Sequence, residues 1–598
     1  MKRLVAALAA SLALAALGAD PYAGYIYPAG LQVGTTNRFL IGGQGLWNVR
    51  RVYFDNPALR VIAVEAVPSF PNPGNEAQRR HIVKWLDGIA AGNPAEPPRP
   101  EDPAVVGEWR SNSWWNVLGS LDPGKIAIVE RSFFTPRNAL QSSPSLSQKM
   151  LVTVAADAGA KTGWCHFMVV TPAGISAPRP FEVCAARRTA EPLYVPPRPT
   201  RPKPEPASVD LRTGGAVLDG RIMPGETDVF RLRLAAKRHY AFVATARELQ
   251  PYVGDAVPGF FNVALVLRDS KGAVVARADD LARFRPDPVL HFMPRAEGEF
   301  TLEVHDVLYR GRADFVYAVA VNAPGRRLFY PGVGYPARVR SAPPDGTVSG
   351  PDVVSRRTFL VDEPGPRILE VVARRRASPL DAVLTLRKSG GGPVLAQWDD
   401  ATNKLFVGTI PQGECDPVGM YDFAAPGEYI AEVADRTGHG GNGYDWWLDV
   451  RKPKPGFDVY STRSTLPLGR RAPLKVEFCI VRKDGFDGDV ALEFPDGVHA
   501  AAPCVATAGV DRVSAKLVYR GRQAVAMRPV RLMASATIGG SVVRVPVTPC
   551  DEYEQAFAWK HLVPAANFVM NAPAAPPAGG GQRKPPPPAE GVKSAPRE

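Results

Sequence analysis

Apolar and polar residues alternate in short runs along most of this chain. The alternation is clear in Leu151–Ala158 and Phe167–Val183, and again in Leu474–Phe494 and Val530–Thr548. Successive side chains of a β-strand point to opposite faces, so a period of two predicts strands with one buried face. The 55 glycine and 61 proline residues favour short strands and many turns over helices. The pattern therefore predicts an all-β protein of sandwich type.

The length of 598 residues predicts about three to five domains rather than one core. Residues 185–206 are rich in proline without apolar periodicity, which predicts an extended linker. Residues 571–598 have too few apolar positions to bury a core and are expected to be disordered. We place a first module at 24–184 and a last, immunoglobulin-like module at 457–565. In the last module, hairpin turns are expected at Asp484–Gly488 and at Gly539–Gly540.

Residues 71–148 interrupt the first module with a different pattern. A helix is expected from Asn75 through Ala91, and a second from Asp122 through Arg131. The apolar face of the first helix comprises Ile82, Trp85, Leu86 and Ile89. Three tryptophans of the insertion could stack on sugar rings, but we expect them to fill a small satellite core: Trp109, Trp114 and Trp115.

An internal repeat follows the linker. Residues 287–321 align without a gap with residues 416–450, so that Gly298 meets Gly427 and Asp306 meets Asp435. Upstream, each copy also carries a pair of adjacent aspartates. Duplication of one β unit is the plain explanation. The two copies are expected to occupy 207–325 and 329–450.

Two family resemblances accompany these patterns. The first module resembles the TIG/IPT immunoglobulin-like domain through Pro28, Gly30, Gly34-Thr35, Gly42-Gly43, Leu46, Val170-Thr171-Pro172, Gly174-Ile175-Ser176 and Phe181. The repeat resembles the bacterial pre-peptidase C-terminal domain, through the Asp pair, Asp-Pro, Gly-Glu-Phe/Tyr and a closing Tyr strand. The first copy adds that family's opening, Gly220 followed by Asp228-Val229-Phe230. These resemblances imply immunoglobulin-like and jelly-roll-like sandwiches. Pre-peptidase domains often accompany secreted peptidases, and some relatives bind calcium.

The N-terminus predicts export. Met1-Lys2-Arg3 precedes an apolar run, Leu4–Ala19, that ends in small residues before Asp20. This arrangement is typical of a secretory signal peptide of about 18 residues. No later segment is apolar enough to predict a membrane span. We therefore expect an extracytoplasmic protein, in the periplasm or at the cell surface.

Export makes disulfides possible, because the compartment beyond the membrane is oxidising. Cys165 and Cys184 flank a hairpin-like stretch, so antiparallel strands would bring them roughly opposite each other, and we predict a disulfide between them. The remaining cysteines allow three pairings, among which the sequence does not choose: Cys415, Cys479, Cys504 and Cys550.

The repeated aspartates are the best candidate metal ligands. Calcium takes six to eight oxygen ligands, which loops at the end of a sandwich can supply. Aspartates in turns more often accept hydrogen bonds from their own backbone, and this structural role is the favoured alternative. The candidates are Asp279, Asp280 and Asp306 in the first copy and Asp399, Asp400 and Asp435 in the second.

Motifs for catalysis are absent from the sequence. It contains no HExxH, GxSxG, Walker or CxxC motif, and no histidine has a second His or Cys at metal spacing, while Cys165 and His166 should face opposite ways. A GxGxxG match at 438–443 lies between two strand-like segments and is interpreted as a turn. Arg374–Arg376 is interpreted as a solvated strand end.

We therefore expect a non-catalytic extracytoplasmic scaffold or adhesion-type protein without a cofactor. Its net charge of +13 is spread thinly and favours acidic partners only weakly. The expected partners are polysaccharides or proteins of the envelope or extracellular space, not nucleic acid. One alternative is a secreted hydrolase or its accessory subunit, and a third treats the two repeats as export modules that are removed during maturation.

Overall fold

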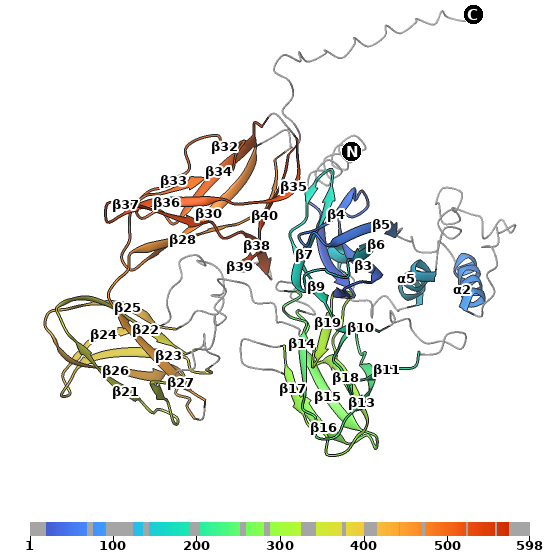
Figure 1. The fold of residues 1–598 in the computed structure, drawn as a ribbon, viewed down its shortest axis with the longest axis horizontal. Helices are drawn as coiled ribbons and strands as arrows, with labels where there is room; N and C mark the ends of the chain where they lie inside the picture. The colour runs from blue at the N-terminus through green and yellow to red at the C-terminus, as the bar shows by residue number, and fades with distance from the viewer. Residues whose placement is uncertain are drawn as a thin grey trace, which may run out of the picture.

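The computed structural model describes residues 20–67, 76–90, 123–134, 143–191, 204–250, 259–279, 287–323, 343–373, 378–399, 416–441, 443–468, 473–521, 524–555 and 559–572. These residues form four modules of packed β-sheets, with two α-helices among the described elements (Figure 1). The predicted all-β fold of tandem sandwiches is therefore confirmed.

Module 1 is a sandwich of two sheets. One sheet has the order β1-β3-β6-β5 and the other β2-β9-β7-β4, with β8 paired to β7. Apolar residues of both sheets, among them Phe39, Phe167 and Phe181, are fully buried between them. The strands are β1 (Tyr22–Tyr27), β2 (Gly30–Gln32), β3 (Thr36–Gln44), β4 (Arg51–Phe54), β5 (Leu59–Val67), β6 (Gln148–Ala156), β7 (Gly163–Thr171), β8 (Gly174–Ile175) and β9 (Arg179–Cys184).

The insertion between β5 and β6 contains both predicted helices. They are α2 (Glu76–Ala90) and α5 (Pro123–Phe134), beside module 1 (Figure 1), and a short 3₁₀ turn, Pro144–Leu146, precedes β6. Ile82, Trp85 and Leu86 are buried, as the helical spacing predicted.

Modules 2 and 3 are the two copies of the repeat, and their sheets have the same strand order. Module 2 has sheets β10-β12-β19-β14-β17 and β11-β13-β18-β15-β16, while module 3 has β20-β27-β22-β25 and β21-β26-β23-β24. Module 2 thus adds one parallel edge strand to each sheet.

The bounds of the strands in the two copies are as follows. Module 2 has β10 (Arg187–Ala190), β11 (Ala207–Asp210), β12 (Ala216–Arg221), β13 (Asp228–Leu234), β14 (Tyr240–Thr245), β15 (Val263–Asp269), β16 (Val274–Ala278), β17 (Val289–Phe292), β18 (Gly298–Asp306) and β19 (Val316–Val321). Module 3 has β20 (Gly346–Thr347), β21 (Ser355–Val361), β22 (Gly365–Val372), β23 (Ala382–Lys388), β24 (Val394–Trp398), β25 (Val418–Phe423), β26 (Gly427–Asp435) and β27 (Asp445–Arg451).

Strand β13 shows how the sequence pattern builds these sheets. Phe230, Leu232 and Leu234 are fully buried, while Arg231 and Arg233 between them are exposed. A strand with this alternation can place one face in the sandwich core and the other in water.

Module 4 has sheets β28-β30-β34-β32, β29-β40-β35 and β33-β31-β36-β37, with the hairpin β38-β39. The predicted turn at Gly539–Gly540 is confirmed, because both glycines have positive φ and join paired strands. The predicted hairpin at Asp484–Gly488 is wrong: the turn exists, but β30 and β31 on its two sides belong to different sheets. The module also extends past residue 565, since β40 is a sheet strand.

The strands of module 4 are β28 (Gly456–Ser461), β29 (Thr465–Pro467), β30 (Leu474–Lys483), β31 (Val490–Glu493), β32 (Val498–Ala500), β33 (Val505–Ala506), β34 (Arg512–Tyr519), β35 (Val525–Val530), β36 (Met533–Ile538), β37 (Ser541–Pro546), β38 (Cys550–Gln555), β39 (Trp559–Pro564) and β40 (Phe568–Ala572).

The predicted linker is partly wrong. Residues 187–190 form β10, which pairs in parallel with β12 and extends the sheet of module 2. Strand pairing here needs backbone hydrogen bonds rather than apolar alternation, so the composition of the segment did not reveal it.

The predicted disulfide between Cys165 and Cys184 is also wrong, since both thiols are free and buried. Cys165 lies opposite Phe181 in the register of β7 and β9, three residues before Cys184. An odd separation along a strand turns the two side chains to opposite faces. Accordingly Cys165 packs in the core of module 1, and Cys184 packs in the cluster between modules 1 and 2.

Modules 1 and 2 share a buried polar contact. Arg188 of β10 donates to both oxygens of Asp219 in β12, at 2.6 and 2.9 Å, and to Glu182 in β9 at 2.6 Å. Asp219 also accepts from the backbone N–H of Ala29 at 3.2 Å. Burial raises the pKa of the Asp219 carboxyl, and the Arg188 guanidinium opposes that rise. Buried apolar residues of both modules pack in one cluster beside this network, so polar and apolar contacts together hold modules 1 and 2 in place.

Module 4 contacts module 1 (Figure 1). Arg463 and Asp20 form an ion pair, and the Arg179 guanidinium lies 5.2 Å from the ring centre of Tyr22 and 5.5 Å from that of Tyr553. The first and last modules of the chain therefore lie side by side.

Within the described part of the chain, neither helix has the length and hydropathy needed to cross a bilayer. Several predictions fall outside the described residues: the signal peptide, the three tryptophans of the insertion, Asp280, Asp400, Cys415, Arg374–Arg376 and the tail after residue 572.

Candidate functional site

A groove of about 1000 Å³ lies on module 1 between β4 and β5. Each of these strands is the edge of its sheet, paired on one side with β7 or β6. The lining is almost entirely one continuous stretch, Arg50–Pro57 and Leu59–Val64, joined by Pro529 from β35 of module 4. The groove is therefore an open site at the rim of the first sandwich.

Three arginines give the groove its charge. Arg50, Arg51 and Arg60 are all exposed. Arg60 lies 3.3 Å from Asp157, and because both side chains are solvent-exposed this pair is weak and can exchange partners. A guanidinium offers planar donors that match a carboxylate in a bidentate geometry. The groove thus presents cations to an acidic ligand.

Tyr53 supplies an aromatic surface within the groove. Its ring centre lies 5.7 Å from the Arg51 guanidinium carbon. The ring also packs against an apolar cluster of Met168, Ile175 and Val569, so both module 1 and module 4 support it. Partial burial and the nearby Asp55 carboxylate raise the pKa of Tyr53, so its hydroxyl stays protonated and able to donate.

The turn between β4 and β5 is held by its own side chains. Asp55 accepts from the backbone N–H of His166 at 2.7 Å, and its second oxygen lies 3.3 Å from the His166 ring. Asn56 accepts from Ala58 and donates to the carbonyl of Lys161, both at 3.1 Å. These two residues therefore fix the turn that closes the groove lined by the three arginines and Tyr53. His166 and Cys165 do face opposite ways, as predicted.

The repeated aspartates have fold roles that match between the copies. Asp306 accepts from the backbone N–H groups of Asn262, Leu308 and Arg310, at 3.1, 2.9 and 3.1 Å. Asp435 accepts in the same way from Asp381, Thr437 and His439, at 2.9, 2.9 and 3.1 Å. Asp306 and Asp435 therefore have the structural role named above as the alternative to calcium binding, in which an aspartate accepts hydrogen bonds from the backbone of its own turn.

The other described candidates lie near arginines. Asp279 is 3.5 Å from Arg277, and Asp399 forms an ion pair with Arg436. Strand β15 separates the end of β16, before Asp279, from Asp306 in β18, and module 3 repeats this order. The structure therefore does not gather these residues into a group of three carboxylates among the residues it describes.

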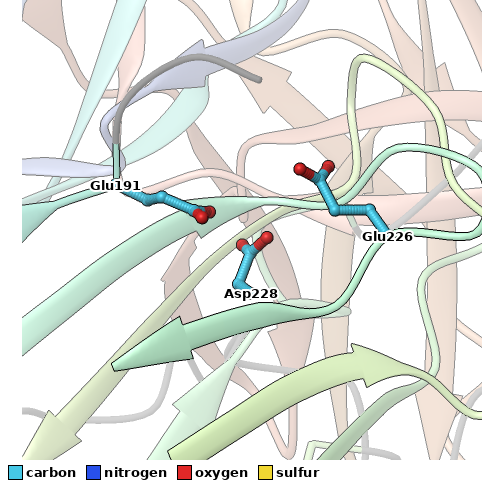
Figure 2. A group of neighbouring side chains, drawn as sticks. All are labelled: Glu191, Glu226 and Asp228. Carbon is cyan, nitrogen blue, oxygen red and sulfur yellow. The ribbon is translucent and has the colours of Figure 1, made fainter. Parts of the chain in front are cut away.

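A different acidic group appears in module 2. The carboxylates of Glu191, Glu226 and Asp228 point toward one another (Figure 2), with oxygens within 4.8 Å. Asp228 accepts from the Tyr317 hydroxyl at 2.7 Å, and Glu226 accepts from the backbone N–H of Met223 at 2.8 Å. Asp228 and Glu226 therefore take part in hydrogen bonds that hold the fold itself together.

The sequence did not single out the groove. The stretch from Arg50 to Val64 contains no motif for binding or catalysis, and exposed arginines on strands are common. The interleaving of arginines with Tyr53 was the available signal. The pairing of His239 with His291, whose ring nitrogens lie 3.2 Å apart, was also missed because the two are distant in sequence.

Comparison with known proteins adds little to this picture. No family model matches the chain, and no curated protein matches it. Among solved structures, a surface glycan-binding protein of a Bacteroides ovatus mixed-linkage glucan utilization locus, in complex with a heptasaccharide, is 8% identical, with a TM-score of 0.13 and coverage of 71% of each chain. The E. coli alpha-2-macroglobulin is 11% identical with a TM-score of 0.13, over 88% of this chain and 30% of that one. Scores this low carry no argument about fold or function.

Proposed function

We propose that this protein is a non-catalytic extracytoplasmic binding protein whose groove between β4 and β5 holds an acidic polysaccharide. The observation that carries the proposal is that Arg50, Arg51, Arg60 and Tyr53 line one open groove, with the Arg51 guanidinium carbon 5.7 Å from the centre of the Tyr53 ring. Arginines pair with uronate carboxylates, and an aromatic ring can lie against the apolar face of a sugar.

The edges of the groove favour a polysaccharide over an added peptide strand. Strand β5 has a bulge between Val61 and Ala63, and it carries Arg60 on its exposed side. Bulges and charges are the features that discourage edge-to-edge strand pairing. A sugar polymer needs side-chain contacts rather than a straight row of free backbone groups, so these features do not obstruct it.

The non-catalytic part of the proposal rests on the absence of recognisable nucleophile or metal motifs from the sequence. Export rests on the charged and apolar start of the chain. A string of sandwich modules that resemble accessory domains is consistent with both.

Binding to immobilised polygalacturonate, with dextran as the neutral reference, tests the proposal. In the variant R51Q/R60Q the affinity for polygalacturonate should fall by roughly tenfold, equivalent to about 1.4 kcal/mol lost from two charged contacts. Binding of the unchanged protein should weaken as salt increases.

The matched control is R231Q/R233Q, which removes two exposed strand arginines from β13 of module 2. This control should bind like the unchanged protein. Equal losses in both variants, or no preference for polygalacturonate over dextran, would overturn the proposal.

A further inference from the structure

A strained, exposed aromatic residue occupies the turn after β18 in module 2. Tyr309 has φ of 53°, a left-handed conformation that is a genuine outlier for a bulky side chain. Its ring stacks on His305, with centres 4.6 Å apart and planes inclined by 3°. Tyr309 is 55% exposed and its neighbour Leu308 is 69% exposed. The turn thus presents a flat apolar surface to solvent.

Module 3 has the same turn without that surface. Tyr309 corresponds to Gly438, with φ of 73°, while Leu308 corresponds to Thr437 and His305 to Ala434. The turn-closing bonds match as well, from Tyr309 N–H to Asp306 at 2.8 Å and from Gly438 N–H to Asp435 at 3.1 Å. Glycine is therefore sufficient to build this turn, and the tyrosine is not required by the fold.

The residue that faces this turn also differs between the two copies. The backbone N–H of Gly225 donates to the carbonyl of Tyr309 at 2.9 Å, and in module 3 Asp352 donates to Gly438 at 3.1 Å. A side chain on Gly438 would come within 2.7 Å of Asp352, whereas a side chain on Gly225 would meet nothing within 4 Å. Each copy thus pairs one glycine with one larger residue. In module 2 the larger residue is Tyr309, on the exposed turn, and in module 3 it is Asp352, on the facing segment.

We propose that Tyr309 and Leu308, backed by His305, form a second binding site that stacks against one pyranose ring of a glycan. Strain that the fold does not need is retained where it serves binding. One face of the Tyr309 ring is occupied by His305, which fixes its orientation and leaves the other face for a ligand.

The size and rim of the surface fit a sugar better than a protein. A stable protein interface buries about 800 Å² on each partner, far more than one aromatic and one aliphatic side chain provide. Polar groups flank the turn: Arg310, which pairs with Asp306 at 2.9 Å, and the Arg268–Glu303 pair at 2.8 Å. Such groups can bond to ring hydroxyls around a single stacked sugar.

Saturation-transfer NMR on the full-length protein tests the site with two neutral probes, cellohexaose and mannohexaose, because the β4–β5 groove is proposed to bind an acidic polysaccharide. We expect transfer to at least one probe to fall by roughly fivefold in Y309G, the factor that a stacking contact of about 1 kcal/mol provides. The melting temperature of Y309G should not fall, because glycine relieves the left-handed strain.

Lys237 provides the matched control, since it too is exposed and has a positive φ of 56°. K237G should leave transfer unchanged, and Y309W should retain it. If no probe shows transfer that depends on Tyr309, or if Y309G lowers the melting temperature without changing transfer, the residue is structural and the proposal is wrong. Variants of the β4–β5 groove leave this readout unaffected, so the two proposals fail separately.

Discussion

Modules 2 and 3 have the same strand order, and they differ at the edges of their sheets. Strand order, the turn after β18 or β26 and the aspartate bonds are the same in both copies. Module 2 alone adds β10 and β11, and through β10 it places a buried arginine against module 1. The shared features are those that the repeat needs in order to fold. The added strands and the buried arginine are specific to module 2 and connect it to module 1.

A glycine within β12 and its counterpart in β20 show the same division inside the sandwich. Gly220 faces Tyr317 and Asp228 in module 2, and Gly346 faces Trp446 and Ser355 in module 3. Any side chain on either glycine would come within 2.7 Å of these groups, so glycine is conserved between the copies while its partners changed. The backbone approach is common to the repeat, and the polar contact of Asp228 with Tyr317 belongs to module 2.

The largest effect should come from breaking the contact that module 3 lacks. R188M should destabilise modules 1 and 2 by about 3–5 kcal/mol, because Asp219 and Glu182 would remain buried without their cation. Hydrogen exchange on the full-length protein should quicken in β9 and β12. Protection of β21–β27 should stay unchanged, and an equal loss there would contradict the separation of the two copies.

The second effect compares the matching aspartates. D306A and D435A should each cost about 1–3 kcal/mol, since each removes the acceptor for three backbone N–H groups. The loss should be larger for D306A, because Arg310 also pairs with Asp306, while the corresponding His439 ring lies 3.9 Å from Asp435. Urea unfolding followed by exchange in each module would show the order, and a reversed order would contradict it.

The lowered pKa of Asp435 predicts how its contribution to stability depends on pH. Burial opposes its charged form, but hydrogen bonds from Thr437, Asp381 and His439 outweigh burial and lower the pKa. The stabilisation is therefore present above the unfolded pKa of about 4 and is lost as pH falls through the lower folded value. D435A should remove this part of the acid sensitivity of module 3.

A smaller effect tests the glycine exchange. G438A should destabilise module 3 by about 1 kcal/mol, from the left-handed conformation and the approach to Asp352. Adding D352G should recover part of that loss, because it removes the facing side chain. If the double variant is no more stable than G438A, the Asp352 side chain is not what requires glycine at position 438.

The smallest effect concerns the thiols of module 1. Cys165 and Cys184 should both be alkylated after unfolding without reductant, and reductant should not shift the melting temperature of module 1. Peptide mapping that finds them joined would restore the disulfide that the register of β7 and β9 excludes.

The sequence predicted the fold class, both helices, the repeat and the turn at Gly539–Gly540, because each depends on a local pattern. It did not predict β10, which lacks apolar alternation and is held by parallel pairing with β12, a strand that the chain reaches only after β11. The predicted disulfide was wrong because the distance of two cysteines from a turn does not determine which face of the sheet each side chain points to. The groove was missed because Arg51 and Arg60 lie on different sheets, and their proximity follows from how two edges meet.

Hydrogen-exchange footprinting of the full-length protein with polygalacturonate tests whether the groove is the polysaccharide site. Bound polygalacturonate should slow exchange in β4, in the turn at Asp55–Asn56 and in β5, with a smaller change in β35 around Pro529. Exchange in β13, with its two exposed arginines, should not change. Protection that appears elsewhere and leaves β4 and β5 unchanged would contradict the assignment of the groove as the polysaccharide site.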